Sequence, residues 1–182
     1  NDAYAYSKRM LEVQCRAYQE QFGDNFVCVV PTNIYGENDN YNLEGGHVIP
    51  TLIHKCYLAK QNGEKFMVRG TGKPLRQFIY AVDLAKLMMW VMEEYEDKSP
   101  IILSVGEKDE MSISNVAALI AREFNYEHMM DFDASYSDGQ FKKTADNGKL
   151  MKLCRNFKFT TMEDGMKKSV EWFVENFDKC RK

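Results

Sequence analysis

The 182-residue sequence lacks several features that would each point to a particular class of protein. It has no apolar run near the ~20 residues that a membrane-spanning helix needs. It also has no long run of basic residues, and its formal net charge is −3, so it does not carry the positive charge typical of proteins that bind nucleic acid or anionic membranes. Only three histidines are present, widely separated and without a ligand spacing, so no metal site is predicted. Two of them, His54 and His128, lie in no motif and are expected at the surface.

Cysteine pairs and a glycine-rich phosphate loop are missing as well. The five cysteines are odd in number and have neither a paired nor a metal-ligand spacing, which favours a reduced, cytoplasmic protein. Gly70-Thr71-Gly72 lacks the third glycine of a dinucleotide fingerprint. A helical pattern starts at once after Asn1, so we expect a fragment of a longer protein, with one core and a minor lobe.

The apolar pattern alternates between helical and strand periods along the chain. Helices are expected at about 3–21, 50–61, 82–95, 112–124 and 162–177, and strands at 26–30, 65–68, 76–80, 101–105 and 129–132. Ser112 is expected to cap the fourth helix. Apolar residues at helical spacing are expected in the core: Leu84, Leu87, Met88, Val91, Val170, Phe173 and Phe177. The alternation predicts an α/β fold with parallel strands and crossover helices.

Tyr4 and Lys8 stand four residues apart in the first predicted helix. Residues i and i+4 share a helix face, so the phenol and the ammonium can meet over one bound molecule. A nearby cation stabilises a phenolate and lowers the pKa of a tyrosine from its usual value of ~10. The spacing therefore suits a proton donor for a carbonyl that is being reduced, although a Tyr–Lys pair on a helix surface has the same spacing.

A second motif follows the strand predicted at 26–30: Pro31-Thr32-Asn33-Ile34-Tyr35-Gly36. In a doubly wound sheet, ligands bind beyond the carboxyl ends of the strands. A YxxxK helix followed by a strand and this motif resembles the extended short-chain dehydrogenase/reductase family of nucleotide-sugar enzymes. The resemblance implies a Rossmann-like NAD(P)-binding domain with a smaller α/β substrate-binding lobe. Residues 1–46 would belong to the first, and residues 47–182 mainly to the second, with about 76–105 returning to the Rossmann sheet.

Three further runs narrow the resemblance within that family. They are Gly46-His47-Val48-Ile49-Pro50, Arg76-Gln77-Phe78-Ile79-Tyr80 and Ser137-Asp138-Gly139-Gln140-Phe141-Lys142-Lys143-Thr144. These runs are similar to the branch that epimerises GDP-4-keto-6-deoxy-D-mannose at C3 and C5 and reduces it at C4 with NADPH. The resemblance implies a missing front half, with the phosphate turn, a catalytic Ser or Thr and a cysteine used in epimerisation, so these residues alone are expected to be inactive. It also implies a homodimer through the YxxxK helix.

The resemblance assigns roles residue by residue. The catalytic residues would be Tyr4, Lys8 and His47, with His47 as the acid of the epimerisation. The NADP(H)-binding residues would be Lys8, Pro31, Thr32, Asn33, Ile34 and His47, and the GDP-sugar-binding residues Lys55, Arg69, Arg76, Asp138 and Lys143. Arg69 departs from the tryptophan usual in the family; its guanidinium plane could stack on a base instead.

Two alternatives stay open from the residues alone. A nucleotide-sugar 4-epimerase or dehydratase of the same superfamily would use Tyr4 and Lys8 without needing His47. A non-catalytic nucleotide-binding or interaction module could retain the same pocket.

Overall fold

The computed structural model describes residues 2–182, so Asn1, where the first expected domain begins, lies outside the described residues. The helices are α1 (Asp2–Phe22), α2 (Val48–Asn62), α3 (Ala81–Glu94), α4 (Ile113–Glu123), α5 (Gly148–Leu153) and α6 (Met162–Glu175), with short 3-10 helices η1 (Glu107–Asp109) and η2 (Glu127–Met129). The strands are β1 (Val29–Pro31), β2 (Asn33–Tyr35), β3 (Phe66–Arg69), β4 (Leu75–Arg76), β5 (Phe78–Tyr80), β6 (Ile101–Leu103), β7 (Met111–Ser112) and β8 (Met130–Asp133).

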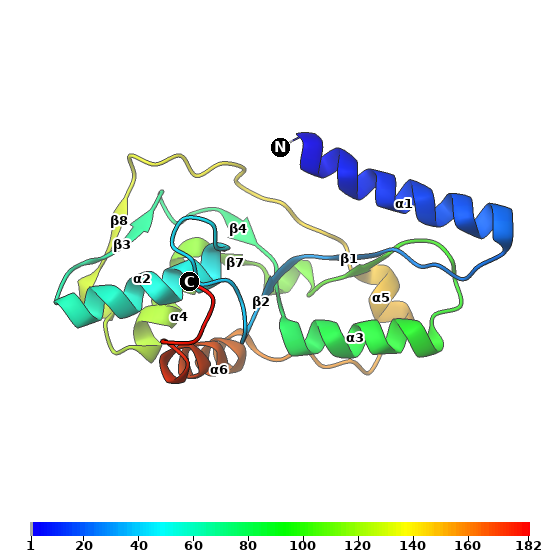
Figure 1. Ribbon diagram of the computed structural model, residues 1–182. Coiled ribbons are helices and arrows are strands. Elements are labelled where there is room, and N and C mark those ends of the chain that lie inside the picture. Colours follow the sequence, from blue (N-terminus) through cyan, green and yellow to red (C-terminus); the bar gives the residue numbers. More distant parts are fainter. Residues whose placement is uncertain (1) are drawn as a thin grey trace.

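The strands pair two by two, mostly in parallel. β1 pairs with β6, β2 with β5 and β3 with β8, all parallel, while β4 and β7 are antiparallel. Parallel partners need a crossover, and helices supply it, as the alternating pattern predicts. Figure 1 shows α1 and α3 on opposite sides of β1, with α2, α4, α6, β3 and β8 gathered at the other end of the molecule.

Two clusters of buried side chains correspond to these two ends. One is centred on α3, β6 and α5 and includes Leu87, Ile101 and Leu150. The other joins α2, β3, α4 and α6 and includes Ile53 and Phe173. The extended segment of β1 and β2 connects them, because β1 pairs on the side of the first cluster and Tyr35 of β2 is buried in the second.

The single strand predicted at 76–80 is wrong, because the chain divides at Gln77 into β4 and β5, which pair with different strands. Gln77 is fully buried, yet its side chain is satisfied: Nε2 donates to the carbonyls of Val105 (2.8 Å) and Ala145 (3.0 Å), and Oε1 accepts from the Ala145 N–H (2.7 Å). Its own carbonyl accepts from the Asn33 amide at 2.8 Å. A buried polar group needs partners, and Gln77 obtains them by redirecting the strand.

Three smaller expectations are also corrected. His54 is buried, with Nδ1 2.8 Å from the Tyr41 carbonyl and its ring against Phe173, because α2 packs on more than one neighbour. Met88 is 44% exposed, whereas its neighbour Leu87 is fully buried. The strand expected at 26–30 begins only at Val29, and the short helix α5 had no counterpart in the pattern.

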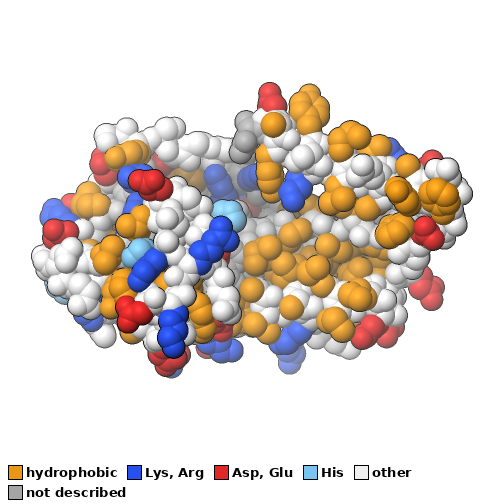
Figure 2. Space-filling view, in the orientation of Figure 1, with side chains coloured by type: hydrophobic (Ala, Val, Ile, Leu, Met, Phe, Trp, Pro, Cys, Tyr) orange, Lys and Arg blue, Asp and Glu red, His pale blue; other side chains and the backbone are white. Residues whose placement is uncertain are grey.

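One face of the molecule is strongly apolar. Helix α1 has no buried residue, and Figure 2 shows hydrophobic side chains gathered along it and across the surface beside it. The exposed large hydrophobic residues of α1 and of the segment that follows it include Met10, Phe26, Val30 and Ile34. Among the described residues, none of the helices combines the length and apolarity needed to cross a membrane.

Candidate active site

The Tyr4–Lys8 pair lies on α1, near its start. The Lys8 ammonium is 5.4 Å from the centre of the Tyr4 ring, so the two side chains share a face as the i, i+4 spacing predicts. The Tyr4 side chain is exposed, and the ring and the ammonium are both accessible to a bound molecule.

The Pro31–Ile34 segment crosses from the β1–β6 pair to the β2–β5 pair. Thr32 donates its hydroxyl to Ser104 at 3.1 Å, and the Asn33 amide is the donor to Gln77 described above. These two hydrogen bonds anchor the segment to the neighbouring strands, whereas Pro31, Asn33 and Ile34 are exposed to solvent. The segment can therefore present backbone and side-chain groups to a ligand on its exposed side.

A cavity of about 320 Å³ lies between α2, β3 and the loop after β8. Among the residues expected from the sequence to act in catalysis or substrate binding, those that line it are His47, Lys55, Arg69, Arg76 and Asp138. His47 is the N-cap residue of α2, but its side chain makes no capping hydrogen bond and is exposed. An imidazole free of a structural bond at a cavity wall can exchange a proton with a ligand.

Three cations meet in this cavity. Burial lowers the pKa of Lys55 from its ordinary value, and the nearby Arg69 lowers it further. The Arg69 guanidinium lies 4.7 Å from the centre of the Tyr136 ring. The Arg76 guanidinium donates to the backbone carbonyls of Leu75 and Gln140, both at 2.7 Å. Such a concentration of positive charge suits a ligand with several negative charges, such as a diphosphate.

Asp138 is held at the rim of this cavity by Thr71. Its two carboxylate oxygens accept from the Thr71 N–H (2.7 Å) and the Thr71 hydroxyl (2.6 Å), and these bonds keep the pKa of Asp138 below its usual range. Gly70 has a φ of +87°, and a Cβ there would lie 2.5 Å from Asp138 Oδ1. The left-handed backbone favours glycine at this position, and glycine also leaves room for the Asp138 carboxylate.

The structure does not bring every predicted residue into the cavity. Tyr4, Lys8 and the Pro31–Ile34 segment are not among its lining residues, and Lys143 also lies outside the lining. The sequence did not predict the contacts of Thr71 with Asp138 and of Tyr136 with Arg69. For Thr71, the two flanking glycines were the available signal.

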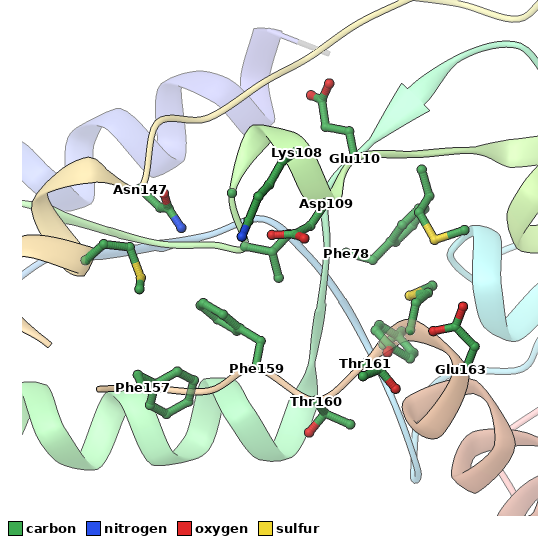
Figure 3. Close-up of a pocket in the computed structure, with 16 residues that line it drawn as sticks. Phe78, Lys108, Asp109, Glu110, Asn147, Phe157, Phe159, Thr160, Thr161 and Glu163 are labelled. Atoms are coloured by element: carbon green, nitrogen blue, oxygen red, sulfur yellow. The ribbon is translucent and has the colours of Figure 1, made fainter. Parts of the chain in front are cut away.

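A second, larger cavity of about 690 Å³ is lined by residues of β5, η1 and the segment before α6, and none of the predicted site residues lines it (Figure 3). Within residues 2–182, no group of three or more His, Cys, Asp or Glu side chains is arranged to hold a metal ion.

The combination of a YxxxK helix and parallel strands joined by helical crossovers agrees with a comparison against protein-family models. The NAD dependent epimerase/dehydratase family matches residues 1–106, and the chain belongs to this family. The predicted α/β, Rossmann-like fold class is thus confirmed.

Within the family, the relatives with high similarity share one name. GDP-L-fucose synthase from Dictyostelium discoideum is 52% identical over all 182 residues, and that from Escherichia coli K12 is 33% identical over 189 aligned positions. A crystal structure of a GDP-L-fucose synthetase from Naegleria fowleri bound to NADP has 48% identity and a TM-score of 0.97 over the whole chain. The chain spans 57%, 59% and 56% of the lengths of these three proteins.

Proposed function

We propose that the natural protein containing these residues is an NADPH-dependent epimerase-reductase that converts GDP-4-keto-6-deoxy-D-mannose to GDP-L-fucose. The observation that carries this proposal is the cavity that places His47 beside Lys55, Arg69, Arg76 and Asp138. A reductase alone needs a proton donor at the carbonyl, whereas an epimerase also needs a group that exchanges protons at the neighbouring carbons. His47 supplies that second requirement.

The cations of the cavity would bind the GDP moiety. Arg76 can place two N–H donors on phosphate oxygens, whereas Lys55 contributes a single charge at the cavity wall. Burial, and to a lesser extent the nearby Arg69, lowers the pKa of Lys55, and a bound diphosphate would offset the repulsion between these two cations. The Arg69 guanidinium lies over the Tyr136 ring, and these two groups could receive the purine base in place of a tryptophan, with Asp138 and Lys143 as further contacts.

Catalysis would divide between two places in the chain. In the reduction, Tyr4 donates a proton to the C4 oxygen while Lys8 stabilises the phenolate that forms. NADPH would supply the hydride, and the cofactor would be held by Lys8, the Pro31–Ile34 segment and His47. The Naegleria relative is described as bound to NADP. In the epimerisation, the cysteine that the resemblance assigns to the front half would remove a proton from the carbon next to the ketone, and His47 would return one on the other face.

The remaining parts of the proposal concern assembly and location. Residues 1–46 would complete a dinucleotide-binding domain to which about 76–105 return, and the rest would form the substrate-binding lobe. Exposed apolar residues on α1, such as Met10 and Leu11, suit a homodimer contact through that helix. The five free cysteines suit the reducing cytoplasm.

The test is conversion of the GDP-keto sugar by the natural protein with NADPH. We expect Tyr4→Phe to reduce NADPH oxidation by roughly 10²- to 10⁴-fold, because the proton donor is lost. Tyr6→Phe is the matched control: Tyr6 is an exposed phenol on the same helix, but it is not four residues from Lys8. Equal activity of the Tyr4→Phe and Tyr6→Phe variants would contradict the assignment.

A further inference from the structure

Residues 137–144 form a segment, called the strap below, that begins at the wall of the substrate cavity and continues past β4. Its first two residues, Ser137 and Asp138, line the cavity. Further along, the Phe141 carbonyl accepts from the Leu75 N–H at 2.8 Å, and Lys142 forms a parallel bridge with Leu75. The strap is therefore extended where it passes β4.

Glu110 holds the far end of this strap. One of its carboxylate oxygens accepts from the Thr144 hydroxyl at 2.5 Å, and the other lies 3.5 Å from the Lys142 ammonium. The Glu110 side chain is only 5% exposed, so these contacts are screened by water less than surface pairs are. Figure 3 shows the carboxylate of Glu110 pointing away from the larger cavity, whereas Lys108 and Asp109 point into it.

The two partners of Glu110 are separated by one residue, Lys143. In extended backbone, successive side chains point to opposite sides. Because Lys142 and Thr144 both turn toward Glu110, Lys143 turns the other way. In the register of the bridge between Leu75 and Lys142, this is the side of Arg76, which lines the cavity, so Lys143 extends from just outside the lining toward a ligand bound there. None of the ion pairs found among residues 2–182 involves Lys143, so its ammonium is available to a ligand. A shift of the strap by one residue would instead bring Lys143 to Glu110 and cancel its charge.

We propose that Glu110 is a positioning residue that fixes the register of the strap and so presents Lys143 to the nucleotide diphosphate. This inference rests on the proposed function, because it takes the cavity as the site of a GDP-sugar. Glu110 itself touches no substrate; it acts through Lys142 and Thr144 on the direction of Lys143.

The experiment measures GDP binding to the natural protein by titration calorimetry, with NADPH binding as a second readout. Glu110→Ala should raise the Kd for GDP about tenfold, the effect of one lost charge-assisted contact, and leave the Kd for NADPH unchanged. Lys143→Ala should raise the Kd for GDP by a similar factor. In the double variant the two losses should not add, because Glu110 acts only through Lys143.

Glu107→Ala is the matched control. Glu107 also pairs with Lys142, at 2.5 Å, but its side chain is 66% exposed and Thr144 binds Glu110 instead. Its loss should change the Kd for GDP less than twofold, since exposed ion pairs contribute little. Glu110→Gln retains one acceptor for Thr144, so its Kd for GDP should lie between those of the wild type and of Glu110→Ala. This variant also replaces Glu110→Ala if Glu110→Ala does not fold.

The outcomes separate the two proposals. A wild-type protein that does not bind GDP contradicts the proposed function itself. A protein that binds GDP, but whose Glu110→Ala and Glu110→Gln variants bind it as tightly, contradicts the positioning role alone. Full additivity of the Glu110 and Lys143 losses would also contradict it, because Glu110 would then act independently of Lys143.

Discussion

Replacement of Gly165 by alanine sets two effects of opposite sign against each other. Gly165 lies inside α6, where alanine is favoured over glycine by about 1 kcal/mol. However, a Cβ at this position would lie 2.9 Å from Cζ and 3.1 Å from Cε2 of Tyr35, and its nearest neighbour would be the Tyr35 hydroxyl oxygen. Real Cβ atoms do not approach other atoms so closely, so the ring or the helix must move.

The ring has little room to move. Tyr35 is 2% exposed, and its ring centre lies 5.6 Å from that of Tyr80. Overpacking a well-packed site costs about 1–3 kcal/mol. Because three atoms of one buried side chain are affected, we take the upper part of that range. After subtraction of the helix gain, Gly165→Ala should destabilise the natural protein by about 1–2 kcal/mol.

The assay is thermal unfolding of the natural protein and its variants. A loss of this size should lower Tm by about 2–8 °C if the affected unit is near 200 residues. Tyr35→Phe removes the nearest clashing atom, so the loss should be smaller when Gly165→Ala is made in that background. A Gly165→Ala variant as stable as the wild type, or more stable, would refute the close contact between α6 and β2.

Two further predictions concern buried polar groups. Asp83 is 1% exposed and accepts from the N–H (2.6 Å) and the hydroxyl (3.0 Å) of Thr160. Asp83→Asn should therefore destabilise the natural protein by about 2–4 kcal/mol in urea unfolding. The same change at the exposed Asp178 should have no effect, and equal stability of the two variants would contradict the contact. Burial lowers the pKa of His54 below its ordinary 6.5, so the unfolded state takes up the proton more readily, and the stability that neutral His54 contributes above pH 6.5 is lost as pH falls through the lowered value. His54→Gln should therefore weaken the dependence of urea stability on pH below 6.5, and an unchanged dependence would exclude His54 as its source.

Features set by neighbours in the sequence could be predicted without the structure. The i, i+4 spacing of Tyr4 and Lys8 gave their shared face, and Ser112 caps α4 as expected, accepting from the Asn115 N–H at 3.1 Å. Both depend only on helix geometry. The family resemblance added the residues of the cavity around His47.

Features set by distant contacts could not be predicted in this way. The clamp between Thr71 and Asp138 joins residues 67 positions apart, and the hydrogen bond between Glu110 and Thr144 of the strap joins residues 34 positions apart. The division of the strand at Gln77 depends on acceptors and donors at Val105 and Ala145. His54 was assigned to the surface because a histidine carries no apolar signal, whereas its position is decided by the neighbours on which α2 packs.

The proposed function assigns reduction and epimerisation to different residues of the natural protein. It is tested most directly by incubating the natural protein with the GDP-keto sugar in deuterated water and following deuterium at C3 and C5 together with NADPH oxidation. Tyr4→Phe should keep the deuterium exchange while NADPH oxidation nearly stops. His47→Gln should suppress the exchange by roughly 10²- to 10⁴-fold, with NADPH affinity measured alongside because His47 is also expected to touch the cofactor. If His47→Gln binds NADPH normally and exchanges deuterium at the wild-type rate, the epimerase assignment is wrong and the chain belongs with the 4-epimerases or dehydratases of its family.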